Sequence, residues 1–136
     1  MAMNPDRPHR ESFDLEGISH TVPIPFGTRV GDMLFSSGIM GVDPSTGRLA
    51  EGLSAQVQFA FANMESLLRK AGGDPGDVGH VRVLVSEEAH RGAVNEAWLR
   101  AFPDAHDRPA RHTVVSVLRG GMLVQLEIVA VLRKPT

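Results

Sequence analysis

One amphipathic stretch, residues 54–71, limits the folds open to this chain more than any other segment. Its apolar side chains recur at spacings of three and four residues, which places them on one face of an α-helix: Val57, Ala60, Phe61, Met64, Leu67, Leu68 and Ala71. Ser54 is the expected N-cap, and Gly72-Gly73 is the expected stop. A helix with one apolar face must pack against another layer of secondary structure, so the surrounding segments decide the fold class.

Those surrounding segments have the composition of β-strands. Strands are expected at Phe13, Leu15 and Ile18, at residues 33–38 and 81–85, in the run that starts at Thr113, and at residues 123–132. Residues 33–38 are expected to form a hairpin with Arg48-Leu49 through the turn at residues 43–47. Residues 20–27 contain two prolines and are expected to be an extended loop. After a tight turn at Gly120-Gly121, the last strand is expected to run antiparallel to the one before it.

A second helix is expected over residues 89–102, where Val94, Ala97, Trp98 and Ala101 face inward and Pro103 ends the helix. The order of elements favours an α+β fold in which two helices cover one face of a mixed sheet. The chain of 136 residues has no repeat or linker, so a single domain is expected over residues 11–136. The polar first ten residues, 1–10, are expected to be a tail outside this domain.

Composition excludes several classes of function. The net charge is −2, with 14 Lys and Arg against 16 Asp and Glu, which argues against nucleic-acid binding because that needs a clustered basic surface. No apolar run approaches the roughly 20 residues of a membrane span, and the first residues lack the apolar core of a signal peptide. The absence of cysteine excludes disulfides and thiolate chemistry and is compatible with a reducing compartment. The expected location is the cytoplasm.

The chain shows no motif for a metal or a nucleotide cofactor. Its six histidines lack metal-ligand spacing, and there is neither a glycine-rich dinucleotide motif nor a P-loop. What remains is a polar set at strand ends, on strands and on the second helix: Ser37, Asn95, Arg111, Thr113, Gln125 and Glu127. Arg111 follows Pro109 where a strand begins, and its planar guanidinium matches a carboxylate through two parallel hydrogen bonds. The simpler alternative for Arg111 alone is a surface ion pair with a nearby Asp. Phe26 is a candidate for stacking on a ligand, although a core position under the loop is the more common role of such a residue.

The ordered series of short motifs resembles the reactive-intermediate deaminase family (RidA/YjgF, also called L-PSP endoribonuclease) from about Val22 to Leu132. The motifs that carry the resemblance are Phe35-Ser36-Ser37-Gly38, Asp43-Pro44-Ser45-Thr46-Gly47, Asn63, Ala71-Gly72-Gly73, Asp77-Val78, Ala93-Val94-Asn95-Glu96-Ala97-Trp98, Phe102-Pro103 and Arg108-Pro109-Ala110-Arg111. The resemblance implies a chorismate-mutase-like fold, a homotrimer with clefts between subunits, and hydrolytic deamination of 2-imino or enamine acids without a cofactor.

The same resemblance implies roles for individual residues. Arg111 would bind the substrate carboxylate, and Ser37, Asn95 and Thr113 would line the cleft. The family carries a Glu-x-Glu pattern in the last strand, and here that segment reads Gln125-Leu126-Glu127. Gln125 would then occupy the catalytic position of the first glutamate, and an amide can hydrogen-bond a water molecule but cannot take its proton. Whether Gln125 or Glu127 faces the cleft depends on the strand register. The family's tyrosine in the N-terminal loop is also absent, with Phe26 the nearest substitute.

Three functions follow from these observations. The first is a hydrolytic deaminase of small imine or enamine carboxylates, and the second is a non-catalytic binder of a keto acid or similar metabolite, which Gln125 favours. The third is a ribonuclease, which the negative net charge and the absence of a basic run disfavour.

Overall fold

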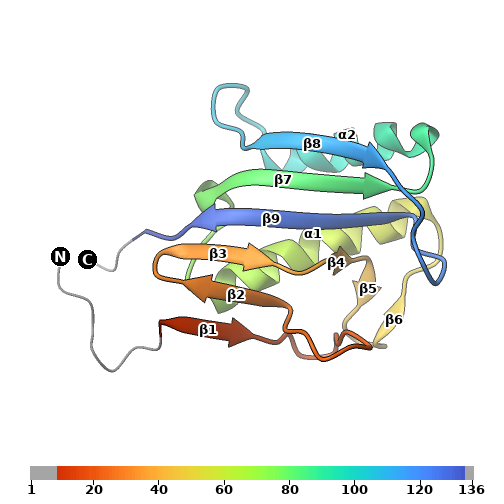
Figure 1. Ribbon diagram of the computed structural model, residues 1–136. Coiled ribbons are helices and arrows are strands. Elements are labelled where there is room, and N and C mark those ends of the chain that lie inside the picture. Colours follow the sequence, from red (N-terminus) through yellow and green to blue (C-terminus); the bar gives the residue numbers. More distant parts are fainter. Residues whose placement is uncertain (1–8, 134–136) are drawn as a thin grey trace.

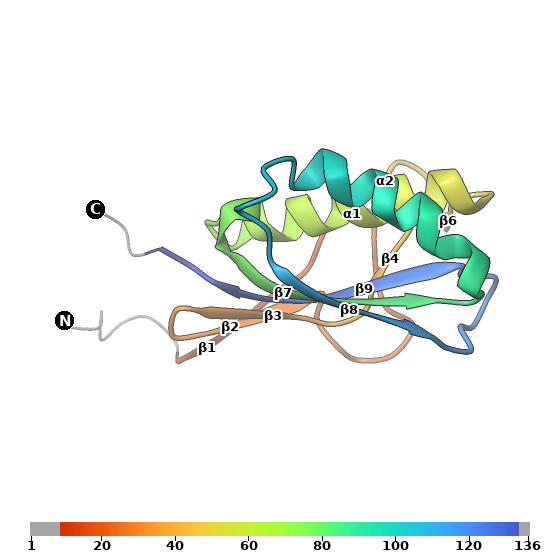
Figure 2. The ribbon, with the colours of Figure 1, turned by 90° about the horizontal axis from the view of Figure 1, so that it is seen from above.

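The computed structural model describes residues 9–133 as one mixed β-sheet with two helices on one of its faces (Figures 1 and 2). The sheet has the strand order β1-β2-β3-β9-β7-β8, with β4 also paired to β9, and a separate two-stranded ribbon is formed by β5 and β6. The elements are β1 (Arg10–Phe13), β2 (Gly27–Val30), β3 (Met33–Ser36), β4 (Ile39–Met40), β5 (Val42–Asp43), β6 (Arg48–Leu49), α1 (Leu53–Lys70), η1 (Pro75–Asp77), β7 (Val78–Val85), η2 (Glu88–His90), α2 (Arg91–Ala101), β8 (Ala110–Val115) and β9 (Val124–Val131). The expected arrangement of two helices on a mixed sheet is confirmed.

The helix α1 buries the apolar stripe expected from its period, but it begins differently. Its N-cap is Gly52, with a φ of 87°, and Ser54 lies inside the first turn without capping it. A backbone conformation with positive φ suits glycine because it has no Cβ, so the turn and not a side-chain cap starts the helix. At the other end Gly72, with a φ of 88°, follows the last turn as expected.

Two polar residues share the buried face of α1 and attach neighbouring loops to it. Gln56 donates from Nε2 to the carbonyls of Ala50 and Gly121 at 3.0 and 3.2 Å, and its Oε1 accepts from the backbone N–H of Leu123 at 2.8 Å. Asn63 donates from Nδ2 to the carbonyl of Met40 in β4 and to that of Val42 in β5. Both buried amides therefore have backbone hydrogen-bond partners in the strands and loops that pass α1.

The N-terminal half of the sheet differs from the expectation in its pairing. The strand β2 was not expected because it carries Arg29, which is buried and paired with Glu11 of β1. A two-residue turn that contains Gly31, with a φ of 61°, joins β2 to β3, so β3 pairs with β2 and β9. The hairpin partner of β6 is β5 instead of the strand at residues 33–38. Arg10 is the first residue of β1, so the expected tail over residues 1–10 extends too far; residues 1–8 lie outside the described part of the chain.

The C-terminal half is arranged around a parallel pair. The chain leaves β7, passes through η2 and α2, and returns as β8, which pairs parallel to β7 at the edge of the sheet (Figure 1). A helical crossover of this kind joins parallel neighbours. The last strand, β9, runs antiparallel to β7 and lies between β7 and β3, so it is not the hairpin neighbour of β8. The second helix is also divided, since its first turn is the 3-10 helix η2.

The two faces of the sheet have different surroundings. Both helices lie on one side, as Figure 2 shows, and along β9 the alternate residues Val124, Leu126, Ile128 and Ala130 are buried beneath them. The intervening residues of β9 point to the opposite side, here called the open face. Apolar side chains are exposed on that face at Met33, Phe35 and Val131. None of the helices described in residues 9–133 is both long and apolar enough to cross a membrane.

Candidate functional site

Arg111 lies in a cluster of side chains between β8 and α2. In register it pairs with Val81 of β7, whose side chain is buried on the helix side of the sheet. Its Nε donates to Thr113 Oγ1 at 2.8 Å and its Nη2 donates to Asn95 Oδ1 at 2.6 Å. The guanidinium also lies over the Trp98 ring, 5.1 Å from the centroid. Residues two apart on a strand share a face, and residues three apart on a helix are neighbours, which is why these four side chains meet.

The charge of Arg111 has no acidic partner in this cluster. Among residues 9–133, no carboxylate lies within ion-pair distance of Arg111, and both hydrogen-bond partners are neutral. Burial lowers the pKa of the Arg111 guanidinium, and the positive charge of Arg91 lowers this pKa further. A lowered pKa means that the folded protein holds the charged form at a free-energy cost, and a bound anion would offset that cost. The cluster is therefore suited to holding a carboxylate.

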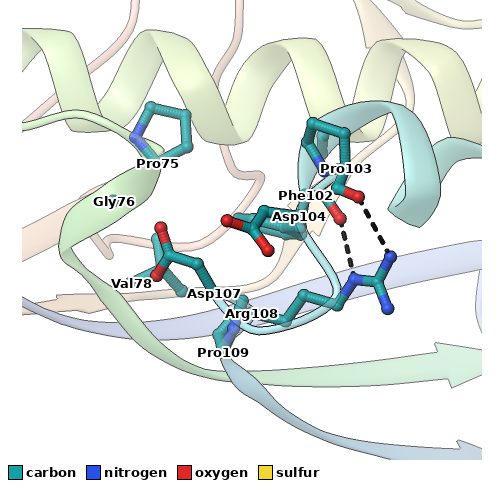
Figure 3. A pocket seen from close by; sticks show the side chains of 10 residues that line it. Pro75, Gly76, Val78, Phe102, Pro103, Asp104, Asp107, Arg108 and Pro109 are labelled. Atoms are coloured by element: carbon teal, nitrogen blue, oxygen red, sulfur yellow. Dashed lines mark hydrogen bonds between the residues drawn. The ribbon is translucent and has the colours of Figure 1, made fainter.

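Arg108, three residues earlier, has a structural role. Its Nε donates to the carbonyl of Phe102 at 2.8 Å and its Nη2 to the carbonyl of Pro103 at 3.3 Å, as Figure 3 shows. These contacts place a positive charge just beyond the C-terminus of α2, where it complements the helix dipole. Arg108, Phe102 and Pro103 line a pocket of about 250 Å³, and Pro75 and Asp104 line it as well. Arg108 thus fixes the loop from which Pro109 leads into β8 and Arg111.

A second group of candidate residues surrounds Gly38 on the open face. A Cβ built on Gly38 would lie 1.5 Å from Nε2 of Gln125, so the Gln125 amide occupies the space that a side chain at residue 38 would fill. Ser37 donates its backbone N–H to the carbonyl of Phe26 at 3.0 Å. Nε2 of His20 lies 3.0 Å from the carbonyl oxygen of Gly38 and is the donor there, since a carbonyl can only accept. The structure therefore places Gln125 against Gly38, the residue that follows Ser37.

Gln125 and Glu127 share the open face, as their spacing predicts, but have different neighbours. Gln125 pairs with Met40 of β4 and Leu84 of β7, next to the Gly38 segment. Glu127 pairs in register with Arg82, and their charged groups are 4.0 Å apart. In this register it is Gln125, and not Glu127, that lies against Gly38.

Phe26 does not present its ring to a ligand in the single chain. It is 2 % exposed and packs in the core, with its ring 5.6 Å from that of His20. The exposed apolar residues of this loop are Val22, at 55 %, and Ile24, at 45 %. His20, Ile24 and Phe26 line a pocket of about 470 Å³. Of the two roles considered for Phe26, the single chain shows the core position under the loop.

The Arg111 cluster and the Gln125 group lie on opposite faces of the sheet. Gln125 and Val114 both pair with Leu84, so β9 and β8 are two strand spacings apart, roughly 10 Å. Arg111 is three residues along β8 from Val114, which adds roughly 10 Å in the strand direction. One chain therefore does not bring Arg111, Asn95 and Thr113 together with Ser37 and Gln125.

Three residues around these two groups were not predicted from the sequence to belong to the site: His20, Arg91 and Trp98. Trp98 was expected to face inward, and the helical period relates Arg91, Asn95 and Trp98 at spacings of four and three residues. That period was the available signal for Arg91 and Trp98, whereas nothing local connects His20 with Gly38. Within residues 9–133, no three His, Asp or Glu side chains are grouped closely enough to hold a metal ion.

Comparison with known proteins agrees with this architecture. The family profile described as Endoribonuclease L-PSP matches residues 24–132. A RutC family protein of Aquifex aeolicus is 35 % identical over 115 residues, which cover 80 % of this chain and 92 % of that protein. A 2-iminobutanoate/2-iminopropanoate deaminase of Salmonella typhimurium is 34 % identical over 110 residues, which cover 79 % and 85 %.

Solved structures show the same fold. The YjgF gene product of Escherichia coli superposes with a TM-score of 0.82 at 25 % identity, covering 90 % of this chain and 99 % of that one. RidA from an Antarctic Psychrobacter species superposes with a TM-score of 0.80 at 26 % identity, covering 93 % and 100 %. The fold is the chorismate-mutase-like fold of these proteins, and the chain belongs to the endoribonuclease L-PSP family, which includes the RutC and RidA/YjgF proteins.

Proposed function

We propose that this protein is a hydrolytic deaminase of small 2-imino or enamine carboxylates, and that Arg111 binds the substrate carboxylate. The observation that carries the proposal is a half-buried guanidinium oriented by Asn95 and Thr113 without an acidic partner among residues 9–133. Two relatives support it, because the Salmonella protein and a mouse protein that is 30 % identical over 110 residues are both named 2-iminobutanoate/2-iminopropanoate deaminase. The cysteine-free composition is consistent with a reducing compartment, and we place the activity in the cytoplasm.

The proposed reaction needs little chemical assistance from the protein. Water adds to the carbon of the protonated imine, the resulting carbinolamine loses ammonia, and a 2-keto acid and an ammonium ion are the products. Arg111 neutralises the carboxylate and fixes the imine carbon, so positioning and charge compensation provide the acceleration. The Gln125 amide oxygen accepts a hydrogen bond from the attacking water and orients it, while the proton passes to the departing amine or to solvent. Neither a metal nor an organic cofactor takes part in this proposal.

We further propose that the active unit is a homotrimer with clefts between subunits. Because the Arg111 cluster and the Gln125 group lie on opposite faces of one chain, a cleft that contains both requires the Arg111 cluster of one copy and the Gln125 group of another. The exposed apolar residues Met33, Phe35 and Val131 offer a surface for such an association. Sedimentation velocity at micromolar concentration is expected to give a trimer, and a stable monomer would contradict the shared cleft.

A complementation experiment tests the shared cleft directly. Arg111→Ala removes the carboxylate site, and Gly38→Val forces the Gln125 amide away, so each variant alone is expected to be inactive. Trimers formed by co-expression contain some clefts in which neither substitution is present, if each cleft draws on two chains. Recovery of activity in the mixture supports the shared cleft. A mixture as inactive as its parents argues that each site lies within one chain.

The function itself is tested by imine hydrolysis. An amino-acid oxidase generates 2-iminopropanoate and 2-iminobutanoate in place, and their decay is followed with wild type, Arg111→Ala, Gln125→Glu and the control Arg100→Ala, an exposed arginine of α2. Arg111→Ala is expected to lower kcat/KM by about 100-fold or more, and Arg100→Ala to leave it unchanged. Wild type that fails to accelerate the decay of either imine would refute the deaminase proposal for these substrates.

The alternative is a non-catalytic binder of keto acids, which the amide at residue 125 favours. It predicts that 2-oxobutanoate raises the melting temperature of wild type but not of Arg111→Ala, while turnover is absent. Activity gained only in Gln125→Glu would then show a cleft that lost a proton acceptor. Turnover of either imine by the wild-type protein would support the deaminase and contradict the non-catalytic binder.

A further inference from the structure

Arg91 places a second guanidinium beside Arg111. It is the first residue of α2, four residues before Asn95 and seven before Trp98, so the three side chains follow one stripe of the helix that faces β8. Its Nη2 donates to the carbonyl oxygen of Thr113 at 3.5 Å. Arg111 donates to the hydroxyl of the same threonine. The two arginines therefore approach each other across a single residue of β8.

The two positive charges interact through the protein. The charge of Arg91 is one of the two causes that lower the pKa of Arg111. Like charges held this close disfavour each other's ionised form, yet an arginine stays protonated in neutral solution. The pair therefore forms a local concentration of positive charge that is not relaxed by proton loss.

Among residues 9–133, the carboxylate within ion-pair distance of either arginine is that of Glu88. Glu88 Oε1 lies 2.5 Å from Nε of Arg91, but the Glu88 side chain is 72 % exposed, whereas that of Arg91 is 39 % exposed. Nε of Arg91 is buried and makes no well-aligned hydrogen bond with any residue in the range 9–133 despite that short contact. An exposed side chain on a short 3-10 helix is easily displaced, and an ion pair of this kind stabilises little.

We propose that Arg91 binds a second carboxylate of the substrate, so that the cleft prefers 2-imino dicarboxylic acids to their monocarboxylic counterparts. This inference rests on the proposed function, since it assigns the substrate class of the same site. Arg111 holds the carboxylate next to the imine carbon, and Arg91 holds the distal carboxylate after Glu88 moves aside. Arg91 is thus a specificity-determining residue, and Glu88 competes with the distal carboxylate for it.

The experiment compares two pairs of imines of equal chain length. Oxidases acting on aspartate and glutamate generate 2-iminosuccinate and 2-iminoglutarate, and those acting on 2-aminobutanoate and norvaline generate the monocarboxylic imines. Arg91→Met is expected to lower kcat/KM for the dicarboxylic imines by about 10- to 100-fold and for the monocarboxylic imines by less than about threefold. Arg91→Lys keeps the charge and is expected to retain most of the preference, and Glu88→Gln is expected to increase it. The matched control Arg100→Met removes an exposed arginine of the same helix.

A binding measurement separates this inference from the deaminase proposal. Oxaloacetate and 2-oxoglutarate are expected to raise the melting temperature of wild type more than 2-oxobutanoate does, and Arg91→Met is expected to abolish the difference. If Arg111→Ala abolishes turnover while Arg91→Met affects both classes of imine equally, the function stands and the assignment of Arg91 is overturned. If neither imine is turned over but the melting temperatures still discriminate through Arg91, the deaminase proposal fails and the dicarboxylate site stands.

Discussion

Gly38→Ala tests whether the Gln125 amide lies where the structure places it. A Cβ at residue 38 would be 1.5 Å from Nε2 of Gln125, 2.7 Å from Cδ and 3.3 Å from Cγ. Non-bonded carbon contacts are favourable at about 3.5–4.0 Å, so the amide must move by roughly 2 Å. The backbone itself does not resist the change, because Gly38 does not have a positive φ.

The magnitude follows from which atoms meet the new methyl group. All three contacts belong to the Gln125 side chain beyond Cβ, so overpacking in wild type is expected to lower the free energy of unfolding by about 1–3 kcal/mol. In a Gln125→Ala background these atoms are absent. There Gly38→Ala is expected to be neutral, or to raise the free energy of unfolding by about 0.4–1 kcal/mol through the lower entropy of the unfolded chain.

Urea unfolding of wild type, the two single variants and the double variant, at one protein concentration, gives this coupling as a double-mutant cycle. The expected coupling is about 1–3 kcal/mol. Imine hydrolysis measured on the same samples is expected to fall in Gly38→Ala, because the displaced amide no longer orients water. An equal cost of Gly38→Ala in both backgrounds would refute the placement of Gln125 against Gly38.

Three further substitutions test other contacts. Gln56→Leu leaves two carbonyls and one N–H without their partner, and urea unfolding is expected to show a loss of about 3 kcal/mol; a loss below 1 kcal/mol would show that these groups find other partners. Asp77→Ala removes a buried carboxylate that accepts from the Asp74 N–H and from Arg133, so a loss of about 1–3 kcal/mol is expected; Arg133→Ala, at the exposed side of the pair, is expected to cost less, and the reverse order would contradict the burial. Trp98→Leu removes the ring beneath the Arg111 guanidinium and is expected to raise KM several-fold with little change in kcat; an unchanged KM would show that the stacking does not position the arginine.

The elements whose signal is local were predicted well. The stripe of α1 and the inward side of α2 follow from a period of 3.6 residues, which the backbone of any helix imposes. The period of two places Gln125 and Glu127 on one face of their strand, as the structure confirms. The first residue of α1 and the strand β2 were missed, because a glycine N-cap and a strand that contains a buried Arg29 carry weak local signals.

Strand order and the positions of the two polar groups depend on the tertiary structure. Sequence period establishes which residues of a strand share a face but not which neighbour the strand selects, because pairing is a contact between distant segments. The insertion of β9 between β3 and β7 brings Gln125 to Gly38, and the crossover through α2 brings Arg91 and Asn95 to β8. The amino-acid sequence alone therefore determined the helices, the alternation of faces and the family to which the chain belongs. Only the packing of distant segments decided that Arg111 and Gln125 lie on opposite faces, and that a second arginine lies beside the first.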